Sequence, residues 1–338
     1  MTENSTRTGP REHGLQRRAV LAGAATAILT PAAVAAFGTP ATAAPGDEDD
    51  TSEGETHRIT MYAEDLGGGQ VGYGLAPGEA TIPGPVLEMY EGDTMEITLV
   101  NTTEQRLSIH PHGVLYDTES DGSPFNDSFN DPGQTRTYIW RTTHEKSLGR
   151  RSRPGSAGYW HYHDHAMGGA HGSGGLIAGL YGALIVRRRG DVLPDHQFTV
   201  VFNGMLINNK TAPDTPMFEA RLGETVEFIC IGHGDLFHTF HLHAHRWANT
   251  RTGYLQGSLD SSEVIDNRDL NPGSSFGFQV VAGEDVGPGA WMYHCHVQFH
   301  SDGGMAGVFL VRNEDGSMPD GAQAAIDRFH QHEGGHSS

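Results

Sequence analysis

The chain has 338 residues, and its 22 Lys and Arg against 42 Asp and Glu give a net charge of −20. This length favours two domains over one. So acidic a surface repels phosphate backbones and excludes a nucleic-acid partner, and two cysteines exclude a disulfide scaffold. Composition therefore leaves one feature to be explained, which is the presence of 21 histidines.

Residues 1–46 have the pattern of a bacterial export signal. Arg17 and Arg18 precede a run of small apolar residues, and Ala41-Thr42-Ala43 offers a cleavage site. Paired arginines favour the twin-arginine route, which exports folded proteins. No later segment is apolar for long enough to cross a membrane. We expect a secreted protein with no membrane anchor.

Short strands dominate the chain after the leader. Segments such as TMEITLVN (94–101) and TVEFICIG (225–232) are rich in β-branched and aromatic residues and are separated by turn residues. No helical period extends beyond a turn or two. The pattern predicts an all-β protein of β-sandwiches, with residues 316–338 as a disordered tail that contains several histidines.

The two halves of the chain repeat each other. PVLEMYEGDTMEI (85–97) matches PMFEARLGETVEF (216–228) with an offset of 131 residues. Towards the ends, YGALIV (181–186) matches AGVFLV (306–311) with an offset of 125, so the first half carries about six extra residues before that point. The repeat predicts two copies of one sandwich, at 56–190 and 191–315.

Histidines recur in His-x-His pairs at matched places in the two repeats. Residues two apart on a strand point to the same face, so each pair offers two imidazoles to one site. Imidazole without carboxylate selects copper, zinc, iron or nickel over magnesium or calcium. The pairs are His110/His112, His163/His165, His241/His243 and His294/His296. Their equivalence in both repeats favours metal binding over ordinary strand polarity.

A second set of residues points to copper. Cys295 lies between two of these histidines, and His300 and Met305 follow it, while His238 opens the motif HTFHLH. Two imidazoles, a thiolate and a weak thioether are the ligands of a blue-copper site. The first repeat lacks this set, because it has Leu107, Asp164 and Gly169 at the places of His238, Cys295 and His300. Cys230 lies in an apolar strand and is predicted to be a core residue.

The motifs HPHG, HYHDH, HTFHLH and HCHVQFHSDGGM together resemble those of the multicopper oxidase family, specifically its small two-domain bacterial laccases. The resemblance covers residues 56–315 and implies two cupredoxin domains, which are Greek-key β-sandwiches. It also implies four coppers per chain. In the family pattern the type 1 copper is held by His238, Cys295, His300 and Met305, the type 2 copper by His110 and His241, and the type 3 pair by His112, His163, His165, His243, His294 and His296.

The resemblance also implies an activity and an assembly. Laccases oxidise phenols and aromatic amines one electron at a time and reduce O2 to water. Met305 as an axial ligand indicates a modest potential. Tyr116 and Asp121 resemble a tyrosine and an acidic residue that small laccases hold near the type 2 copper, where they take part in oxygen reduction. The family pattern further implies a homotrimer with copper clusters between subunits.

Three alternatives remain open. A copper nitrite reductase has the same two domains but needs only three histidines at its type 2 site. A blue-copper electron carrier would use Cys295 but leave most of the histidines without a role. A cuprous-ion oxidase shares the scaffold but usually has a methionine-rich insert, whereas the 10 methionines here are scattered. His161 is not expected to be a ligand, because its repeat counterpart is Met292.

Overall fold

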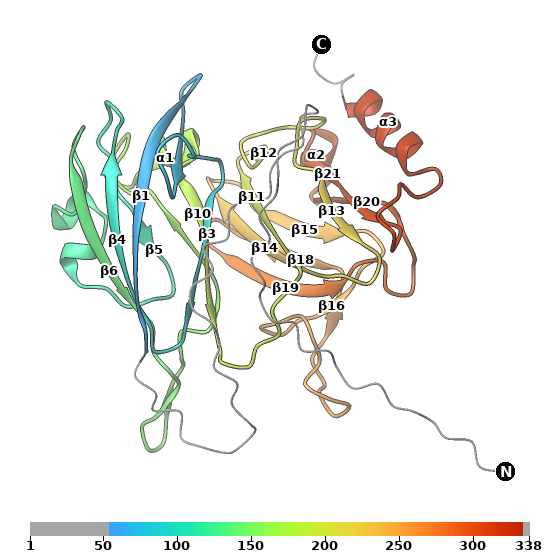
Figure 1. Ribbon diagram of the computed structural model, residues 1–338, viewed down its shortest axis with the longest axis horizontal. Coiled ribbons are helices and arrows are strands. Elements are labelled where there is room, and N and C mark those ends of the chain that lie inside the picture. The colour runs from blue at the N-terminus through green and yellow to red at the C-terminus, as the bar shows by residue number, and fades with distance from the viewer. Residues whose placement is uncertain (1–53, 334–338) are drawn as a thin grey trace.

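A computed structural model describes residues 54–333, and the predicted export signal lies outside them. The described residues are mainly strands, so the prediction of an all-β protein is confirmed (Figure 1). No helix in this part of the chain is both long and apolar enough to cross a membrane.

The first sandwich, called domain 1 below, contains two four-stranded sheets (the blue-to-green part of Figure 1). One sheet has the order β2 (Gln70–Gly74), β1 (Thr56–Gly67), β4 (Thr94–Asn101), β6 (Thr135–Arg141). The other has the order β3 (Gly84–Tyr90), β10 (Tyr181–Arg187), β9 (Gly158–His163), β5 (His110–Pro111). Strand β4 buries every second side chain, as expected for a strand with one face on the core.

The second sandwich, domain 2, repeats this arrangement. One sheet has the order β12 (Leu206–Ile207), β11 (His196–Asn203), β14 (Thr225–His233), β19 (Ser275–Val281). The other has the order β13 (Phe218–Arg221), β21 (Ala306–Arg312), β20 (Gly289–Cys295), β15 (His238–Leu242), β18 (Asn267–Leu270). The aromatic core between these sheets includes Cys230, in agreement with the sequence prediction.

Strand register reproduces the sequence repeat. Strands β3 and β10 pair in parallel with Glu88 opposite Ile185, and β13 and β21 pair in parallel with Glu219 opposite Leu310. These partners are the residues that the offsets of 131 and 125 relate. The repeat is therefore a repeat of three-dimensional structure as well as of sequence.

The remaining elements are short apart from one helix. Two ribbons are formed by β7 (Lys146–Ser147) with β8 (Ser152–Arg153) and by β16 (Trp247–Ala248) with β17 (Val264–Ile265). The helices are η1 (Thr118–Ser120), η2 (Pro124–Asn126), α1 (Ser173–Ala178), α2 (Gln298–Asp302) and α3 (Ala322–Glu333), of which the first two are 3₁₀-helices.

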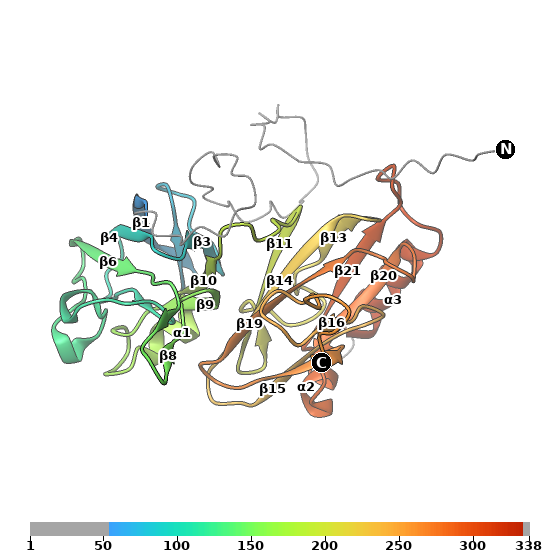
Figure 2. The same cartoon turned by 90° about the horizontal axis from the view of Figure 1, so that it is seen from below.

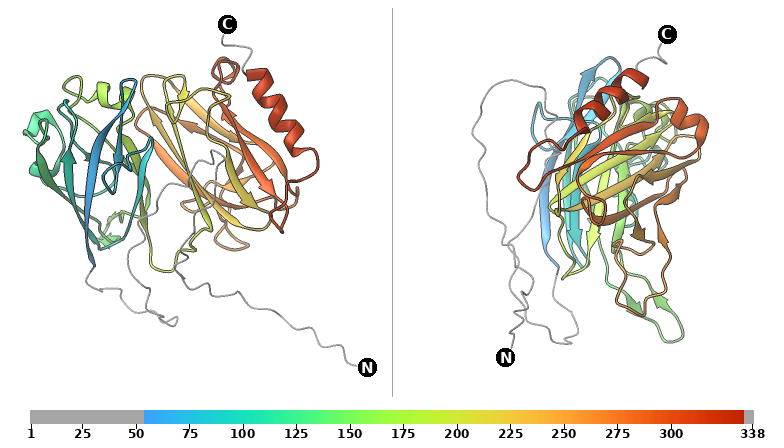
Figure 3. Two further views of the ribbon diagram at one scale, coloured as in Figure 1. Left: turned by 45° about the horizontal axis from the view of Figure 1, so that its top comes forward. Right: turned by 90° about the vertical axis from the view of Figure 1, so that its right-hand side faces the viewer.

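Helix α3 corrects the prediction of a disordered tail. It packs along the outer side of domain 2 (Figure 3), where Ile326 and Phe329 bury their side chains against Val308 and Leu310 of β21. Ile326 and Phe329 are three positions apart and so share one face of the helix. This packing supplies the stability that so short a helix lacks on its own. Residues 334–338 of the predicted tail lie outside the described residues.

The two sandwiches meet through an apolar contact and a buried polar cluster. The apolar contact joins Ile185 and Ala183 of β10 to Ile229 and Ile231 of β14. Figures 1 and 2 show the two units side by side, with β9 and β10 facing β14 and β19.

The polar cluster, called the domain clamp below, is centred on Arg187. Its guanidinium donates to both carboxylate oxygens of Glu227, at 3.1 and 2.7 Å, and to Glu88 at 3.0 Å. Glu227 is fully buried and also accepts hydrogen bonds from Tyr159, Gln197 and Gln279. The charges are paired and hydrogen-bonded, as buried charges must be. The clamp draws residues from both domains and fixes their relative placement.

Candidate metal centres

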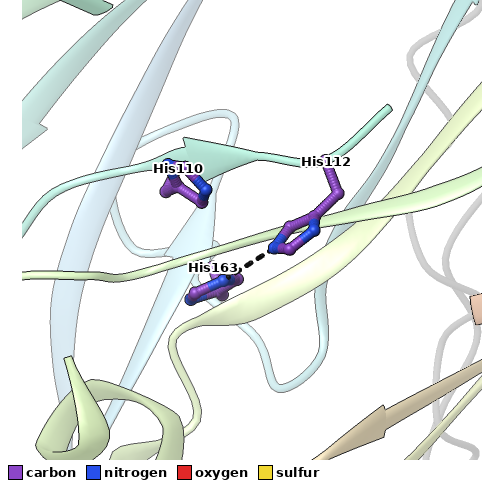
Figure 4. A group of neighbouring side chains, drawn as sticks. All are labelled: His110, His112 and His163. Carbon is purple, nitrogen blue, oxygen red and sulfur yellow. Dashed lines mark hydrogen bonds between the residues drawn. The ribbon is translucent and has the colours of Figure 1, made fainter. Parts of the chain in front are cut away.

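Strand pairing brings the domain 1 histidines together. His110 of β5 lies opposite His163 of β9 in the antiparallel ladder. His112 follows on the same side, and its Nε2 lies 3.1 Å from Nε2 of His163 (Figure 4). One ligand atom from each of the three rings lies within 4.8 Å of the others. This spacing suits a metal ion held by several imidazoles.

Domain 2 repeats the arrangement. His241 of β15 lies opposite His294 of β20, and Nε2 of His243 lies 3.2 Å from Nε2 of His294. These three histidines form a second group whose ligand atoms lie within 4.8 Å of one another. Below, the two sets are called the domain 1 and domain 2 histidine groups.

The remaining member of each His-x-His pair lies beside its group. The ring centroids of His165 and His110 are 5.1 Å apart, and those of His296 and His241 are 5.3 Å apart. The structure therefore gathers the eight paired histidines in two equivalent sets of four.

Backbone carbonyls orient four of these rings. In His163 and His294 the Nδ1–H donates to the carbonyl of the next residue, at 2.7 and 2.8 Å. In His110 and His241 it donates to the carbonyls of Asp121 and Asp266, at 2.5 and 2.8 Å. A second hydrogen bond of this kind is usual for metal-binding histidine, because it fixes the tautomer and leaves the Nε2 lone pair for the metal.

Burial also favours the neutral imidazoles that metals require. Burial, together with the neighbouring imidazoles His110 and His165, lowers the pKa of His112 to about 4. Burial likewise lowers the pKa of His294 to about 4, with the nearby histidines adding to the effect. These rings are therefore neutral near pH 7 and are able to bind a metal.

The predicted blue-copper residues also converge. Sγ of Cys295 lies 3.6 Å from Nδ1 of His238 and 3.5 Å from Nδ1 of His300, and all three side chains are buried. They come from β15, β20 and α2, at one end of domain 2. Met305 is fully buried in the same core cluster as Cys295, and its backbone N–H donates to the carbonyl of His300. Two imidazoles and a thiol at this spacing fit a trigonal copper site.

Tyr116 and Asp121 both lie beside His110. The ring of Tyr116 meets that of His110 edge-on, with centroids 5.6 Å apart. The carboxylate of Asp121 is 3.6 Å from Nδ1 of His110 and accepts hydrogen bonds from Ser123 and Asn126. Burial and the charge of Asp121 raise the pKa of Tyr116. Both side chains therefore lie close enough to influence a metal bound by His110.

The structure adds residues that sequence reasoning missed. His161 is buried and stacks on His112, with centroids 4.0 Å apart. His233 of domain 2 packs against His161 and His163, at 5.0 and 5.4 Å. Asp266 stands beside His241 as Asp121 stands beside His110. Ring packing across a domain boundary leaves no sequence signal, and Asp266 does not obey the offset of 131.

The two histidine groups remain separate within one chain. Among residues 54–333, no candidate metal group combines side chains from both domains. His233 faces the domain 1 group from domain 2, whereas the domain 2 group lies elsewhere, on β15 and β20.

Comparison with known protein families agrees with this geometry. Two family models described as multicopper oxidase match residues 78–191 and 186–315. Together they cover every predicted copper ligand and both sandwiches apart from strands β1 and β2.

Curated relatives are much longer than this chain. A probable nitrite reductase-hydroxylamine oxidoreductase fusion protein from Kuenenia stuttgartiensis is 34% identical over 76% of this chain and 30% of its own length. Hephaestin from Rattus norvegicus is 26% identical over 69% of this chain and 22% of its own length. The chain thus spans less than a third of these relatives.

Solved structures share the fold. A blue copper oxidase from Nitrosomonas europaea superposes with a TM-score of 0.54 at 21% identity, over 84% of this chain and 95% of that one. A copper nitrite reductase from the same organism gives a TM-score of 0.55 at 19% identity, over 76% and 94%. The expected pair of cupredoxin-like Greek-key sandwiches is confirmed. The chain belongs to the multicopper oxidase family.

Proposed function

We propose that the protein is a two-domain laccase, which oxidises phenols and aromatic amines one electron at a time and reduces O2 to water. The observation that carries the proposal is the duplication of the histidine group, with Nε2–Nε2 distances of 3.1 Å in domain 1 and 3.2 Å in domain 2. A reaction centre of three histidines would need only one such group. Two matched groups supply enough imidazoles for a cluster of three coppers.

Copper fits the residues present. The His2Cys set of domain 2 has the nitrogen and sulfur donors of a blue-copper site, and the two histidine groups have only nitrogen donors. We propose four coppers per chain, held as the family pattern assigns them. Copper in these sites would accept single electrons and deliver them to O2, so that four oxidised phenols balance one O2 converted to two waters.

The chain itself supplies connection and proton handling. Cys295 is bonded directly to His294 and His296, so the backbone joins the blue-copper set to the domain 2 histidine group. Its thiol is buried, which keeps solvent from the sulfur. Asp121 holds a carboxylate beside His110, where it is able to pass protons towards the site of oxygen reduction, and Tyr116 offers a phenol there.

Oxygen uptake tests the activity. We expect the copper-loaded protein to consume O2 with an electron-rich phenol, at four phenols per O2 and without releasing peroxide. Nitrite and Cu(I) would be tried in parallel, because they are the substrates of the two alternative enzymes. The proposal would be refuted if the protein reduced nitrite to nitric oxide but consumed no O2 when phenol was added.

Nitrite reduction is the second candidate, because the relative that is 34% identical is named a probable nitrite reductase fusion. A single histidine group would be enough for it. Replacing both His112 and His163 with alanine, or both His243 and His294, would separate the two candidates. A laccase would lose all O2 reduction in either variant, whereas a reductase that uses one group would tolerate one of the two changes.

We further propose that the two histidine groups meet between subunits of a homotrimer. The proposal is supported by their separation within one chain and by the clamp, which opposes a rearrangement of the domains. When head-to-tail contacts close into a ring, the domain 1 group of every chain faces the domain 2 group of a neighbouring chain. Each metal cluster would then link two subunits, so copper would also stabilise the assembly.

Mixing two inactive variants tests this arrangement. Chains with His112 and His163 replaced retain domain 2, and chains with His243 and His294 replaced retain domain 1. Refolding them together should restore activity, because a mixed ring contains an interface with both groups intact. Activity from a monomer, detected by light scattering of the active fraction, would contradict the trimer.

Export by the twin-arginine route remains our proposal for the leader, on the basis of Arg17 and Arg18. We expect the double change R17K/R18K to retain the protein inside the producing cell. Normal secretion of that variant would show that another route is used.

A further inference from the structure

In each domain one residue lies between the last two paired histidines in the sequence. In domain 2 this residue is Cys295, and in domain 1 it is Asp164. Both are fully buried. The backbone N–H of each donates to the strand that follows, from Asp164 to Leu180 at 2.9 Å and from Cys295 to Met305 at 3.0 Å. The two side chains therefore hold equivalent positions.

The carboxylate of Asp164 joins two segments that carry histidines. One oxygen accepts a hydrogen bond from the backbone N–H of Ser108 at 2.7 Å, two residues before His110. The other accepts from the N–H groups of Met167 at 2.8 Å and Ala166 at 3.2 Å, in the turn after His165. A buried carboxyl group that accepts several backbone N–H groups holds the segments that carry them in place.

Ser108 completes the network. Its hydroxyl accepts the N–H of His165 at 3.0 Å and contacts Asp164 at 3.4 Å. In domain 2 the equivalent Thr239 accepts the N–H of His296 through its hydroxyl at 3.1 Å. Both domains thus tie the last histidine to the strand that holds the first pair, but only domain 1 adds a carboxylate.

A short helix covers the central residue in both domains. In domain 1, α1 approaches so closely that a Cβ at Gly175 would lie 2.2 Å from a carboxylate oxygen of Asp164. In domain 2, α2 brings His300 to the thiol of Cys295. The carboxylate contacts in domain 1 therefore occupy the place of the His238–Cys295–His300 set in domain 2.

We propose that Asp164 is a positioning residue for the domain 1 histidine group, and that its hydrogen bonds do there what a metal–thiolate centre would do in domain 2. This inference rests on one part of the proposed function, which is that the domain 1 histidine group binds copper. It implies that domain 1 is organised before any metal arrives.

Hydrogen exchange of the metal-free protein tests the first part. In the wild type we expect the amides of Ser108, Ala166 and Met167 to exchange slowly both before and after copper is added. In Asp164→Asn, one carboxylate oxygen becomes an amide NH2 that faces N–H donors. Exchange at the three domain 1 amides should rise about 10- to 100-fold.

Copper titration of the same proteins against a competing chelator tests the second part. Asp164→Asn should weaken copper binding by the domain 1 group about 10- to 100-fold, while the visible absorption of the blue-copper set stays unchanged. Ser108→Ala, a milder break in the network, should lie between this variant and the wild type.

Asp93→Asn is the matched control, because Asp93 is also a buried domain 1 carboxylate that accepts backbone N–H groups, from Glu55 at 2.9 Å and Tyr90 at 3.0 Å. It should lower the stability of the domain without changing copper affinity. Equal losses of copper in both aspartate variants, or unchanged exchange and binding in Asp164→Asn, would overturn the inference. A chain that passes these tests but reduces nitrite would refute only the proposed laccase activity.

Discussion

His163 of domain 1 and His294 of domain 2 occupy matching ends of matching strands, but their surroundings differ. His163 is buried, and the ring of His233 from the other domain packs against it at 5.4 Å. His294 is half-buried, and within residues 54–333 its ring neighbours are His241, His243 and His296 of its own set. Strand register therefore sets the geometry of the ligands, whereas neighbouring elements set their exposure. The domain 1 histidine group is partly enclosed by the rest of its own chain, whereas the domain 2 group is more exposed.

The largest effect is expected from removing the thiol of Cys295, because domain 1 has no equivalent of it. Cys295→Ser should abolish both the blue colour and phenol oxidation, because the thiolate supplies the colour and the bonded path to His294 and His296. Copper bound by the histidine groups should remain, as measured by metal analysis and electron paramagnetic resonance. Cys230→Ala is the control and should stay blue; strong blue absorption in Cys295→Ser would assign the site to another residue.

The next test asks whether the two groups are equal in function as they are in geometry. His163→Gln and His294→Gln should each lose copper and O2 reduction to the same extent, since one cluster would need both rings. Metal content and oxygen uptake measure this directly. Loss in one variant with normal activity in the other would mean that the groups serve different sites.

Glu227→Gln tests how much the domain clamp, which joins the two domains, contributes to stability. Burial opposes ionisation of Glu227, but the hydrogen bonds and charge of Arg187 outweigh it and lower the pKa of the carboxyl below 4.5. The resulting stability is present above pH 4.5 and is lost as the pH falls through the folded-state pKa. At neutral pH the variant should lose about 3 kcal/mol in unfolding free energy.

Urea unfolding at neutral pH and at about pH 3 checks this sign, because the difference between variant and wild type should shrink in acid. Glu219→Gln removes the part-exposed ion pair with Arg312 and should cost less than about 1 kcal/mol at either pH. An acid-independent loss would show that the charge of Glu227 is not what stabilises the clamp.

The smallest effect is expected from Tyr116→Phe, which removes a hydroxyl that domain 1 alone presents. Its repeat counterpart is Trp247, a buried core residue. The variant should keep its copper content and colour while turnover or the radical signal during O2 reduction changes. Tyr62→Phe serves as the control, and identical kinetics in the two variants would remove Tyr116 from the reaction.

Much of the site could be predicted because it obeys local rules. The period of two along a strand puts both members of each pair on one face, and the offset of 131 predicts that the two domains hold them alike. The ladders agree, because His110 lies opposite His163 and His241 lies opposite His294. The contacts of His161 with His233 could not be predicted, because they depend on how two domains meet. Asp266 escaped because the loop before it differs in length from its counterpart.

Helix α3 escaped for a similar reason. Its apolar residues are few, and the helix is stable only because β20 and β21 present an apolar outer face to Ile326 and Phe329. Such a pattern in isolation is indistinguishable from a polar tail, since packing rather than propensity supplies the stability.

The position of α3 has a practical consequence for attaching the protein to an electrode in a chosen orientation. Met292 of β20 faces the helix, whereas Cys295 of the same strand faces the inner core, so the helix and the thiol lie on opposite faces of one sheet. A tether attached at the exposed Gln323 would hold the His238, Cys295 and His300 side chains one sheet away from a conducting surface. A tether on domain 1 would place the whole width of that domain in between. Orientation on an electrode could thus be chosen by moving one attachment point.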